Sequence, residues 1–309
     1  MEASVRSPRQ LCLTDTEFRM FGQLLRAHCG LHFCEDLRYL LEKRIARRVE
    51  SLGLGSFASY HYLLRRGGEG DGELARLVDD VTTNETYFMR EQKQLRALVQ
   101  EILPEHRAAR RTRAPIHIWS AGCSSGEEPY SIVILALEAG LDPERDVRVY
   151  ASDISRTMLQ RARRGLYRES AFRAMDQAMR DRYFVEKDGL RRISDQVKRH
   201  VCFAHLNLLD PARTSLLGPM DIVLCRNVII YFDLETKRRV IQTFERKLRP
   251  GGHLLLGHSE SLINLSTAFE LRHLRNDMVY RKPGPGESLD PWHHAAAEAA
   301  QRVAQGGEA

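Results

Sequence analysis

The segment Ile116-His-Ile-Trp-Ser-Ala-Gly-Cys-Ser-Ser-Gly-Glu-Glu-Pro-Tyr-Ser131 decides the fold of this chain. It opens with Ile116 and Ile118 in alternation with His117 and Trp119, which is the period of a half-buried strand. Small residues follow, with glycines at Gly122 and Gly126. The apolar stretch 131–137 comes next and is typical of a buried helix. A strand, a glycine-containing turn and a helix in this order predict a ligand site at the carboxyl end of a sheet strand.

The residues after the two glycines favour a ligand that carries positive charge. A dinucleotide site would have the spacing G-x-G-x-x-G and a pyrophosphate at the helix N-terminus. Here the carboxylates of Glu127 and Glu128 follow the second glycine and would repel a pyrophosphate. They suit S-adenosylmethionine, which has a sulfonium and an ammonium group. We therefore expect S-adenosylmethionine as the cofactor and S-adenosylhomocysteine as its product.

The next predicted strand ends at Asp153, 27 residues after Gly126. An acid in this place can accept hydrogen bonds from both ribose hydroxyls of a nucleoside. Asp153 would alternatively cap the helix that follows, as aspartate often does. The paired glutamates upstream favour the cofactor interpretation.

Length and composition limit the class of protein. At 309 residues, the chain suits two domains. Its hydrophobic content of 43% and charged content of 28% are ordinary for a globular protein. There is no run of 18 apolar residues and no signal-peptide core at the start, so we expect a cytoplasmic protein without direct membrane insertion. The net charge of +6 indicates an anionic partner, either nucleic acid or an acidic protein surface.

The six cysteines contain no C-x-x-C pair, so the sequence indicates neither a metal site nor a disulfide framework. Cys202 and Cys225 fall in apolar strands, and we expect both in the core.

Residues 11–80 predict a small helical domain. Thr14 and Glu17 form a capping box at its first helix. An apolar stripe at helical spacing defines the second helix, with the members Leu37, Leu41, Ile45, Val49 and Leu52. Basic side chains lie opposite this stripe or on its margin: Lys43, Arg44, Arg47 and Arg48. They form either a solvated face or a docking surface for an acidic partner. A flexible glycine-rich loop, 65–72, precedes a further helix at 73–81.

Residues 81–113 join the two predicted domains. The polar segment Thr82-Thr-Asn-Glu85 could cap the helix that follows, and its side chains also suggest the wall of a pocket. We expect that helix at 91–107 and an exposed basic connector at 107–113.

From residue 114 to 282, strands and helices alternate as in a doubly wound parallel sheet. The expected strands are 116–121, 147–152, 200–204, 220–225 and 252–257, with a last apolar stretch at 277–281. Residues 248–252 read as a helix end and a Pro-Gly-Gly turn. Residues 165–198 interrupt the alternation and predict an inserted antiparallel subdomain, with a helix at 170–183 and a hairpin that turns at Asp188 and Gly189. We expect residues 283–309 to form a disordered tail.

Six segments together resemble the chemoreceptor glutamate methyltransferases, the CheR family. The resemblance runs from about residue 11 to residue 282. The segments are Thr82-Thr-Asn-Glu-Thr-Tyr-Phe-Met-Arg-Glu91, Trp119-Ser-Ala-Gly-Cys-Ser-Ser-Gly-Glu-Glu-Pro-Tyr-Ser131, Ala151-Ser-Asp-Ile154, Asn207-Leu-Leu209, Cys225-Arg-Asn-Val-Ile-Ile-Tyr-Phe232 and Gly257-His-Ser-Glu260.

The resemblance implies a class I S-adenosylmethionine methyltransferase sheet behind an all-helical domain that meets the acidic helical bundle of a chemoreceptor. It implies that the cofactor is bound by Asn84, Thr86, Arg90, Glu128, Asp153, Asn207, Leu208, Arg226 and Asn227. In the family, the inserted subdomain can hold a pentapeptide tether at the receptor's carboxyl terminus. The hairpin between Phe184 and Leu190 looks shorter here than in tether-dependent members. We expect a monomer that acts on a receptor and not on nucleic acid.

The implied chemistry is simple. A glutamate carboxylate has a reference pKa of about 4.3, so the acceptor would itself be the nucleophile and would need no general base. An anion and a cation would give neutral products, so a dry site that aligns them would supply much of the acceleration. Arg90 could orient the carboxylate through its two-pronged fork. Tyr231 could donate a hydrogen bond, wall the methyl group or only pack under a loop.

Three other functions remain open at this stage. An amine-directed nucleic-acid methyltransferase would explain the basic charge, but such enzymes usually carry an Asn/Asp-Pro-Pro-aromatic stretch, and Asn227-Val-Ile-Ile-Tyr231 has no proline. A cofactor-sensing scaffold would bind the cofactor without labelling an acceptor. A small-molecule methyltransferase would leave the basic helical domain without an evident role.

Overall fold

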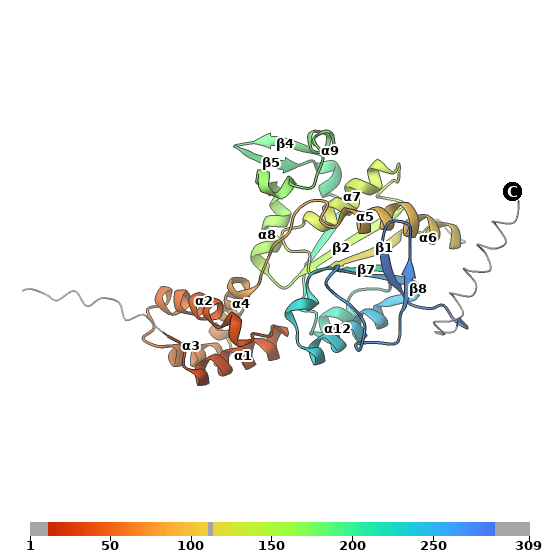
Figure 1. The fold of residues 1–309 in the computed structure, drawn as a ribbon. Coiled ribbons are helices and arrows are strands. Elements are labelled where there is room, and N and C mark those ends of the chain that lie inside the picture. The colour runs from red at the N-terminus through yellow and green to blue at the C-terminus, as the bar shows by residue number, and fades with distance from the viewer. Residues whose placement is uncertain (1–11, 111–113, 288–309) are drawn as a thin grey trace, which may run out of the picture.

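The computed structural model describes residues 12–110 and 114–287 and shows two lobes (Figure 1). The smaller lobe is helical and comes first in the chain, while the larger lobe is built on a twisted sheet. This arrangement confirms the predicted fold class. No helix in the described part of the chain is long and apolar enough to cross a membrane. Residues 111–113 of the predicted connector and 288–309 of the predicted tail lie outside the described residues.

The helical lobe contains these described elements: α1 (Asp15–Cys29), η1 (Glu35–Leu37), α2 (Arg38–Ser51), α3 (Phe57–Leu64) and α4 (Glu69–Val81). The predicted capping box begins α1, where the Thr14 hydroxyl accepts from the N–H of Glu17 and the Glu17 carboxylate accepts from the N–H of Thr14. The predicted stripe of α2 is buried only in its middle, since Leu37 and Leu52 at its ends are 37% and 38% exposed.

The glycine-rich segment 65–72 is not the free loop that its composition predicts. Helix α4 already begins at Glu69. A Cβ atom at Gly70 would lie 2.4 Å from the carbonyl oxygen of Leu63, so this glycine allows α4 to pack closely against α3.

The polar segment 82–85 ends α4 and does not cap the next helix. The Thr82 hydroxyl donates to the carbonyl oxygen of Asp79. The connecting helix begins later and contains a π-helical turn, with the parts α5 (Gln92–Ala97), η2 (Leu98–Ile102) and α6 (Leu103–Ala109). Arg110 departs from the predicted exposed connector, because its guanidinium forms an ion pair with the buried Asp221.

The main sheet has the strand order β6-β2-β1-β7-β8-β10-β9. The bounds are β1 (Ile116–Ala121), β2 (Val147–Asp153), β6 (Val201–His205), β7 (Met220–Cys225), β8 (Leu248–Leu256), β9 (Glu270–His273) and β10 (Met278–Arg281). The strands from β6 to β8 are parallel, whereas β10 and β9 are antiparallel. Since β2 and β7 flank β1 on opposite sides, the strand order reverses there and creates a crevice at the carboxyl ends of the strands.

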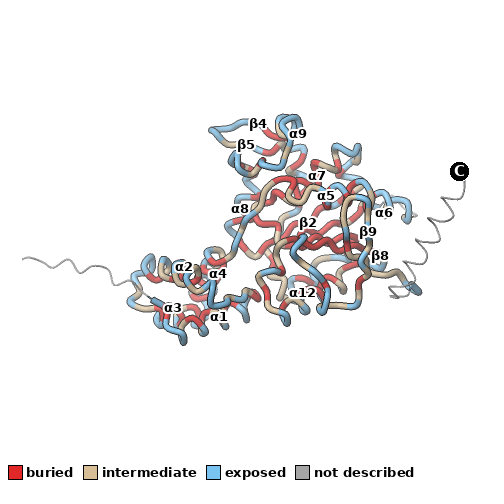
Figure 2. The backbone as a smooth tube through the Cα atoms, in the orientation of Figure 1, coloured by how far each residue is buried: buried red, intermediate tan, exposed pale blue. Residues whose placement is uncertain are grey.

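Both faces of the sheet are covered by helices, so its centre is buried (Figure 2). The bounds of the helices around it are α7 (Glu127–Glu138), α8 (Arg156–Arg164), α10 (Asp195–Lys198), α11 (Pro211–Ser215), η4 (Ile229–Tyr231) and α12 (Leu234–Lys247). Strand β1 contributes to the hydrophobic cores on both faces of the main sheet: Ile118 packs with the connecting helix and α7, while Trp119 packs with α12. The strand is therefore buried on both faces, and not on one face as its alternation predicts.

Three strand predictions need correction. Strand β8 begins at Leu248, because the Pro-Gly-Gly segment continues the strand through a register shift and is not a separate turn. The short strand β9 was not predicted. Cys202 is exposed, since β6 is an edge strand, while Cys225 in β7 is buried as expected.

The inserted subdomain forms a second sheet, in the order β3-β5-β4, as predicted for an antiparallel insertion. Its parts are β3 (Leu166–Tyr167), η3 (Glu169–Phe172), α9 (Gln177–Tyr183), β4 (Phe184–Lys187) and β5 (Leu190–Ile193). The helical stretch is thus broken in two. Asp188 and Gly189 form the hairpin turn, both with positive φ. Phe88 of the linker is fully buried against Phe172 and Phe184, which fixes the linker to this subdomain.

Candidate active site

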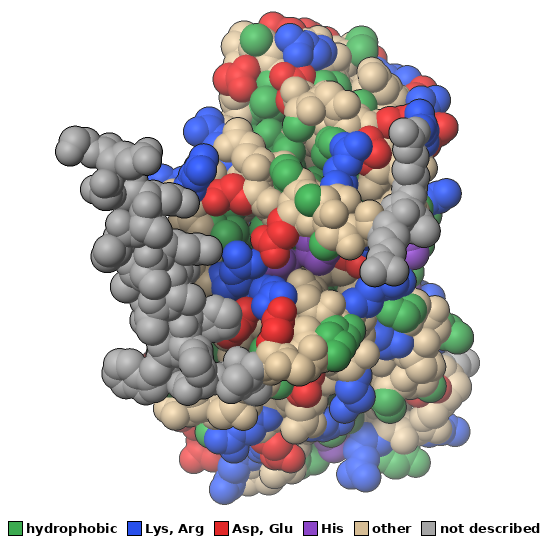
Figure 3. Space-filling view, turned by 90° about the vertical axis from the view of Figure 1, so that its right-hand side faces the viewer, with side chains coloured by type: hydrophobic (Ala, Val, Ile, Leu, Met, Phe, Trp, Pro, Cys, Tyr) green, Lys and Arg blue, Asp and Glu red, His purple; other side chains and the backbone are tan. Residues whose placement is uncertain are grey.

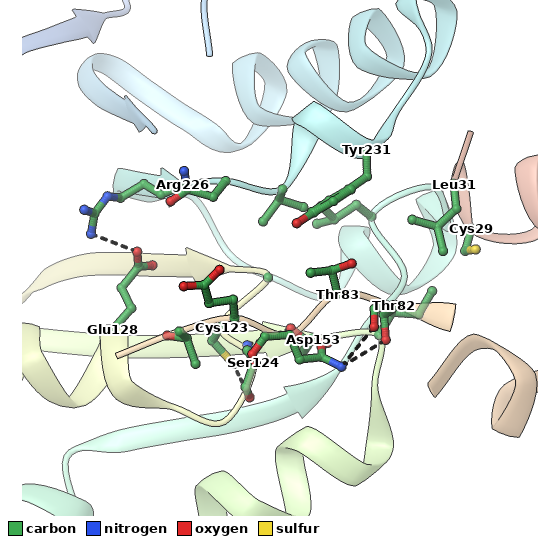
Figure 4. Close-up of a pocket in the computed structure, with 18 of the residues that line it drawn as sticks. Cys29, Leu31, Thr82, Thr83, Cys123, Ser124, Glu128, Asp153, Arg226 and Tyr231 are labelled. Atoms are coloured by element: carbon green, nitrogen blue, oxygen red, sulfur yellow. Dashed lines mark hydrogen bonds and ion pairs between the residues drawn. The ribbon is translucent and has the colours of Figure 1, made fainter. Parts of the chain in front are cut away.

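A cavity of about 970 Å³, including its open mouth, lies at the crevice between the two lobes (Figure 4). Its wall consists of the loops after β1, β2, β6 and β7, the linker segment 82–90, and Cys29 and Leu31 of the helical lobe. The predicted cofactor-binding and catalytic residues all line this cavity: Asn84, Thr86, Arg90, Glu128, Asp153, Asn207, Leu208, Arg226, Asn227 and Tyr231.

Gly122 makes the turn after β1 possible. Its φ is +80°, in the left-handed region, and a Cβ atom there would lie 2.4 Å from a methyl carbon of Val228. Its N–H and that of Cys123 donate to the carbonyl oxygen of Ser152, at 2.8 and 2.9 Å. The loops after β1 and β7 therefore approach each other at van der Waals distance, which only glycine permits.

Asp153 ends β2 and is 7% exposed. Its two carboxylate oxygens accept from the backbone N–H groups of Ser124 and Ser155, at 2.7 and 2.8 Å. The next helix, α8, is capped by Ser155, whose hydroxyl accepts from the N–H of Met158. Asp153 is therefore not the helix cap, and burial raises the pKa of its carboxyl group.

Arg226 leaves the end of β7 and crosses the crevice to two carboxylates. One nitrogen lies 3.1 Å from Glu128, and the other lies 3.0 Å from Glu91 and donates to the carbonyl oxygen of Arg90 at 2.6 Å. Ser120 donates to the second Glu128 oxygen at 2.7 Å. Since the Arg226 side chain is only 2% exposed, this buried network fixes Glu128 at the wall of the cavity and Glu91 behind it.

Glu127, the other residue of the glutamate pair, does not reach the cavity wall. It is 4% exposed, and its carboxylate accepts from the Ser125 hydroxyl. Burial raises its pKa to about 7. The two adjacent glutamates therefore differ in role: Glu128 faces the cavity, while Glu127 packs inside the loop.

The helical lobe closes one side of the cavity through the segment 30–32. Leu31 forms a bridge with Phe232, and the N–H of His32 donates to the carbonyl oxygen of Tyr231 at 2.9 Å. The side chain of Asn207 donates to the carbonyl oxygen of His28 at 2.6 Å. Figure 4 shows Cys29 and Leu31 on the same side of the cavity as Tyr231.

The four predicted docking residues lie away from the cavity, on α2, and they differ in environment. Lys43 and Arg47 are exposed. Arg48 instead forms a two-pronged ion pair with Glu73, at 2.8 Å for each contact. Arg44 is partly buried and reaches towards the carbonyl oxygen of Thr82 at 3.5 Å. Two of the four side chains thus contribute to the interior of the helical lobe, which the helical spacing did not predict.

Sequence reasoning missed several residues of the site. Glu91 pairs with Arg226, and Cys29, Leu31, Val228 and Phe232 complete the cavity wall. Glu91 and Phe232 lie inside segments that carry the family resemblance, so a signal was present for them. Cys29 and Leu31 carry no local signal, because only the packing of the two lobes brings them to the cavity.

The residues present fit S-adenosylmethionine. Two buried polar atoms at the cavity, Asn227 Oδ1 and Arg226 Nε, have no hydrogen-bond partner among the described residues. The carboxylates of Glu128 and Asp153 offer acceptors for a cationic, hydroxyl-bearing ligand. No group of His, Cys, Asp and Glu residues in the described part of the chain is arranged to hold a metal ion.

The doubly wound sheet, the glycine turn and the acidic strand end define a class I methyltransferase. Residues 16–82 match the family model described as CheR methyltransferase, all-alpha domain, and residues 84–278 match CheR methyltransferase, SAM binding domain. The chain therefore belongs to the CheR methyltransferase family, and S-adenosylmethionine is its cofactor.

Relatives of known type support the same assignment. The chain is 37% identical over 281 residues to chemotaxis protein methyltransferase 2 of Vibrio cholerae, which covers 90% of this chain and 97% of that protein. It is also 37% identical over 268 residues to the chemotaxis protein methyltransferase of Escherichia coli, with 85% and 90% covered.

Proposed function

We propose that this chain methylates glutamate side-chain carboxylates on the cytoplasmic helical bundle of chemoreceptors. The products would be glutamyl methyl esters and S-adenosylhomocysteine. One observation carries the proposal: the cofactor cavity is completed by the same helical lobe that presents exposed basic side chains. An acidic helical partner on that lobe would lie beside the cavity. The names of the relatives, chemotaxis protein methyltransferases, support this acceptor class.

The cavity offers a distinct partner for each polar part of the cofactor. S-adenosylmethionine supplies an electrophilic methyl group on its sulfonium. We assign the Asp153 carboxylate to the ribose hydroxyls, since each of its oxygens keeps a free lone pair beside its backbone bond. We assign Glu128 to the ammonium group, because its carboxylate lies at the wall and is held by Arg226.

The remaining task of the chain is to align the acceptor carboxylate and to exclude water from it. A glutamate side chain is ionised at neutral pH, since its reference pKa is about 4.3, so no protein base has to remove a proton. Arg90 is the proposed orienting group, because its guanidinium can bind two carboxylate oxygens at once. One of its nitrogens donates to the carbonyl oxygen of Glu85 at 2.8 Å, which holds the side chain at the wall. Tyr231 is the proposed second contact.

Two exposed basic side chains of the helical lobe share one face of α2. Lys43 and Arg47 are one helical turn apart on the exposed face of α2 and therefore point the same way. Figure 3 shows the face that is turned away from the helical lobe, where basic and acidic side chains are mixed. That face therefore shows no single patch of basic side chains among its described residues.

The test is a transfer of tritiated methyl groups from S-adenosylmethionine to the cytoplasmic fragment of a chemoreceptor. We expect label in the fragment that is released by mild alkali, as a carboxyl methyl ester would be. A fragment with its acceptor glutamates replaced by glutamine is the control and should take up no label.

Other outcomes would support the competing functions. Alkali-stable label on the fragment would exclude a glutamyl ester. Label on RNA or DNA in place of the fragment would indicate a nucleic-acid methyltransferase. Calorimetric binding of S-adenosylhomocysteine without any labelled acceptor would indicate a cofactor-sensing scaffold.

A further inference from the structure

The carboxylate of Glu260 lies at the centre of a group of backbone N–H donors. One oxygen accepts from Asn227 and Gly257, both at 2.7 Å. The other accepts from Val228 at 2.9 Å and from Ile230 at 3.2 Å. Four backbone donors on one carboxylate fill most of its lone pairs, so Glu260 acts here as an anionic acceptor for main chain alone.

These donors come from the ends of two neighbouring strands. Cys225, the last residue of β7, pairs with Leu256, the last residue of β8. Both chains leave the sheet at this point, and their N–H groups lose their ladder partners. Glu260 supplies the replacement acceptor, which a buried backbone N–H requires.

Gly257 shows how closely the carboxylate fits. A Cβ atom on Gly257 would lie 2.9 Å from the bound Glu260 oxygen and 2.9 Å from the backbone nitrogen of Asn227. The two loops are therefore in contact through main chain, and a larger residue would separate them. The backbone of Glu260 also donates to the carbonyl oxygen of Gly257 at 2.8 Å, which closes the turn that carries the carboxylate.

The loop held in this way forms part of the cavity wall. Asn227, Val228 and Tyr231 all line it. Asn227 has a φ of +58°, in the left-handed region, which asparagine adopts more readily than most residues other than glycine. Its N–H donates to Glu260, so the carboxylate contacts the loop at this turn.

We propose that Glu260 is a positioning residue for methyl transfer: its carboxylate holds the loop 227–231 so that Asn227 and Tyr231 face the cofactor and the acceptor. A glutamine of the same shape cannot replace it, because its amide group would direct donors at two of the N–H groups. The loop would then shift, and a displacement of the order of 1 Å can reduce turnover by about a hundredfold. This inference rests on the proposed acceptor only for its activity assay.

The test is Glu260→Gln, examined first without any acceptor. In the complex with S-adenosylhomocysteine, the amide protons of residues 227, 228 and 230 should exchange at least tenfold faster in the variant. With the receptor fragment as acceptor, kcat should fall at least tenfold when it is calculated from the concentration of sites that bind S-adenosylhomocysteine. The dissociation constant for S-adenosylhomocysteine should rise by a smaller factor than the fall in kcat, because the loop loses the contact of Asn227 while Asp153 and Glu128 stay in place. Glu260→Asp, which keeps the charge, should recover part of the protection.

Glu101→Gln is the matched control. Glu101 also holds a turn, since its carboxylate accepts from the backbone N–H groups of Arg275 and Asn276, at 2.8 and 3.2 Å, but it lies away from the cavity. This variant should lose thermal stability and keep kcat. Equal protection of the loop in wild type and Glu260→Gln, or equal loss of kcat in the Glu101→Gln control, would overturn the inference. A wild-type protein that labels no receptor fragment would contradict the proposed acceptor and leave the exchange result to decide on Glu260.

Discussion

The Asp153 carboxylate combines two duties at the scale of a single residue. It holds the turn after β1 through the N–H of Ser124, and it presents free lone pairs to the cavity. A charge-assisted hydrogen bond is stabilising by about 1.5–3 kcal/mol. The loss of such bonds should therefore be measurable as a loss of ligand affinity.

We expect Asp153→Ala to weaken S-adenosylhomocysteine binding by about ten- to a hundredfold in calorimetry. The variant should also lose thermal stability, since Ser124 and Ser155 lose their acceptor. Ser155→Ala is the control: it removes the cap of α8, at a cost of about 1 kcal/mol, and leaves the carboxylate in place. An unchanged affinity in Asp153→Ala would remove this residue from the ribose site.

Glu127 gives a prediction about pH. Its folded-state pKa of about 7 is above the ordinary value of 4.5, so the folded protein binds the proton more tightly than the unfolded chain. The stability from this group is present below pH 4.5 and is lost as the pH rises towards about 7. Glu127→Gln should flatten this part of the curve in urea denaturation between pH 5 and pH 8. An equally steep decline in the variant would assign the pH dependence to other groups.

Residues with a motif could be predicted from the sequence, and residues that act through space could not. Asp153, Glu128 and Arg226 lie in short segments with a recognisable composition. Glu260 also lies in such a segment, but its role depends on four backbone donors from separate loops. Leu31 reaches the cavity only because two lobes pack together.

At the scale of the element, the basic side chains of α2 fall into two groups, one that pairs with a buried acid and one that is exposed to solvent. Arg48 and Tyr60 both bind the Glu73 carboxylate, which is 5% exposed, so removal of Arg48 would leave a buried acid without its cation. Lys43 and Arg47 make no such contact with an acid in the described residues. The periodicity of α2 predicted which residues face the core, but it could not show which basic side chain finds an acid on α4.

We expect the double reversal Lys43→Glu and Arg47→Glu to slow methylation of a receptor fragment about tenfold or more at low salt, because exposed charge steers the encounter. S-adenosylhomocysteine affinity should not change. Added salt should slow the wild type more than the variant, since screening acts over about 8–10 Å at physiological ionic strength.

The control for this prediction is the same change of charge on α12, through Arg239→Glu and Arg246→Glu, which are also exposed. Equal rates for wild type and the α2 variant at every salt concentration would dismiss α2 as the docking surface. Equal losses for the α2 and α12 variants would attribute the effect to net charge.

Element boundaries were less predictable than element types. The composition of segment 65–72 predicts a loop because glycine disfavours helices in isolation, whereas here Gly70 is needed for close helix packing. The Pro-Gly-Gly segment predicts a turn, although β8 passes through it with a bulge. In both cases a tertiary contact overrides a local propensity.

At the scale of the whole molecule, Gly30 joins the lobes. It ends α1 with a φ of +80°, and a Cβ atom there would lie 2.5 Å from a methyl carbon of Thr236 on α12. Arg26 adds ion pairs to Asp233 and Glu235 at the start of the same helix. This contact sets the position of Leu31 against Phe232 at the cavity.

We expect Gly30→Ala to weaken S-adenosylhomocysteine binding by about three- to tenfold, because a shift of the interlobe contact would displace Leu31 from the cavity wall. The left-handed backbone at this position should also destabilise the folded variant by about 1–2 kcal/mol. Gly53→Ala is the control. Gly53 has a φ of +64° but nothing within 4 Å of its Cβ position. The Gly53→Ala variant should have a lower thermal stability and an unchanged affinity for S-adenosylhomocysteine. Identical affinity in both variants and wild type would show that the lobes do not depend on each other at this point.

The bridge between Leu31 and Phe232 has a consequence for how the chain can be divided. Because one wall of the cavity belongs to the helical lobe, the larger lobe alone contains only part of the cofactor-binding cavity. Cofactor contacts at Cys29 and Leu31 would therefore stabilise the packing of the two lobes as well as the bound cofactor. If an acceptor on that lobe changes the affinity for the cofactor, the cofactor must change the affinity for the acceptor by the same factor.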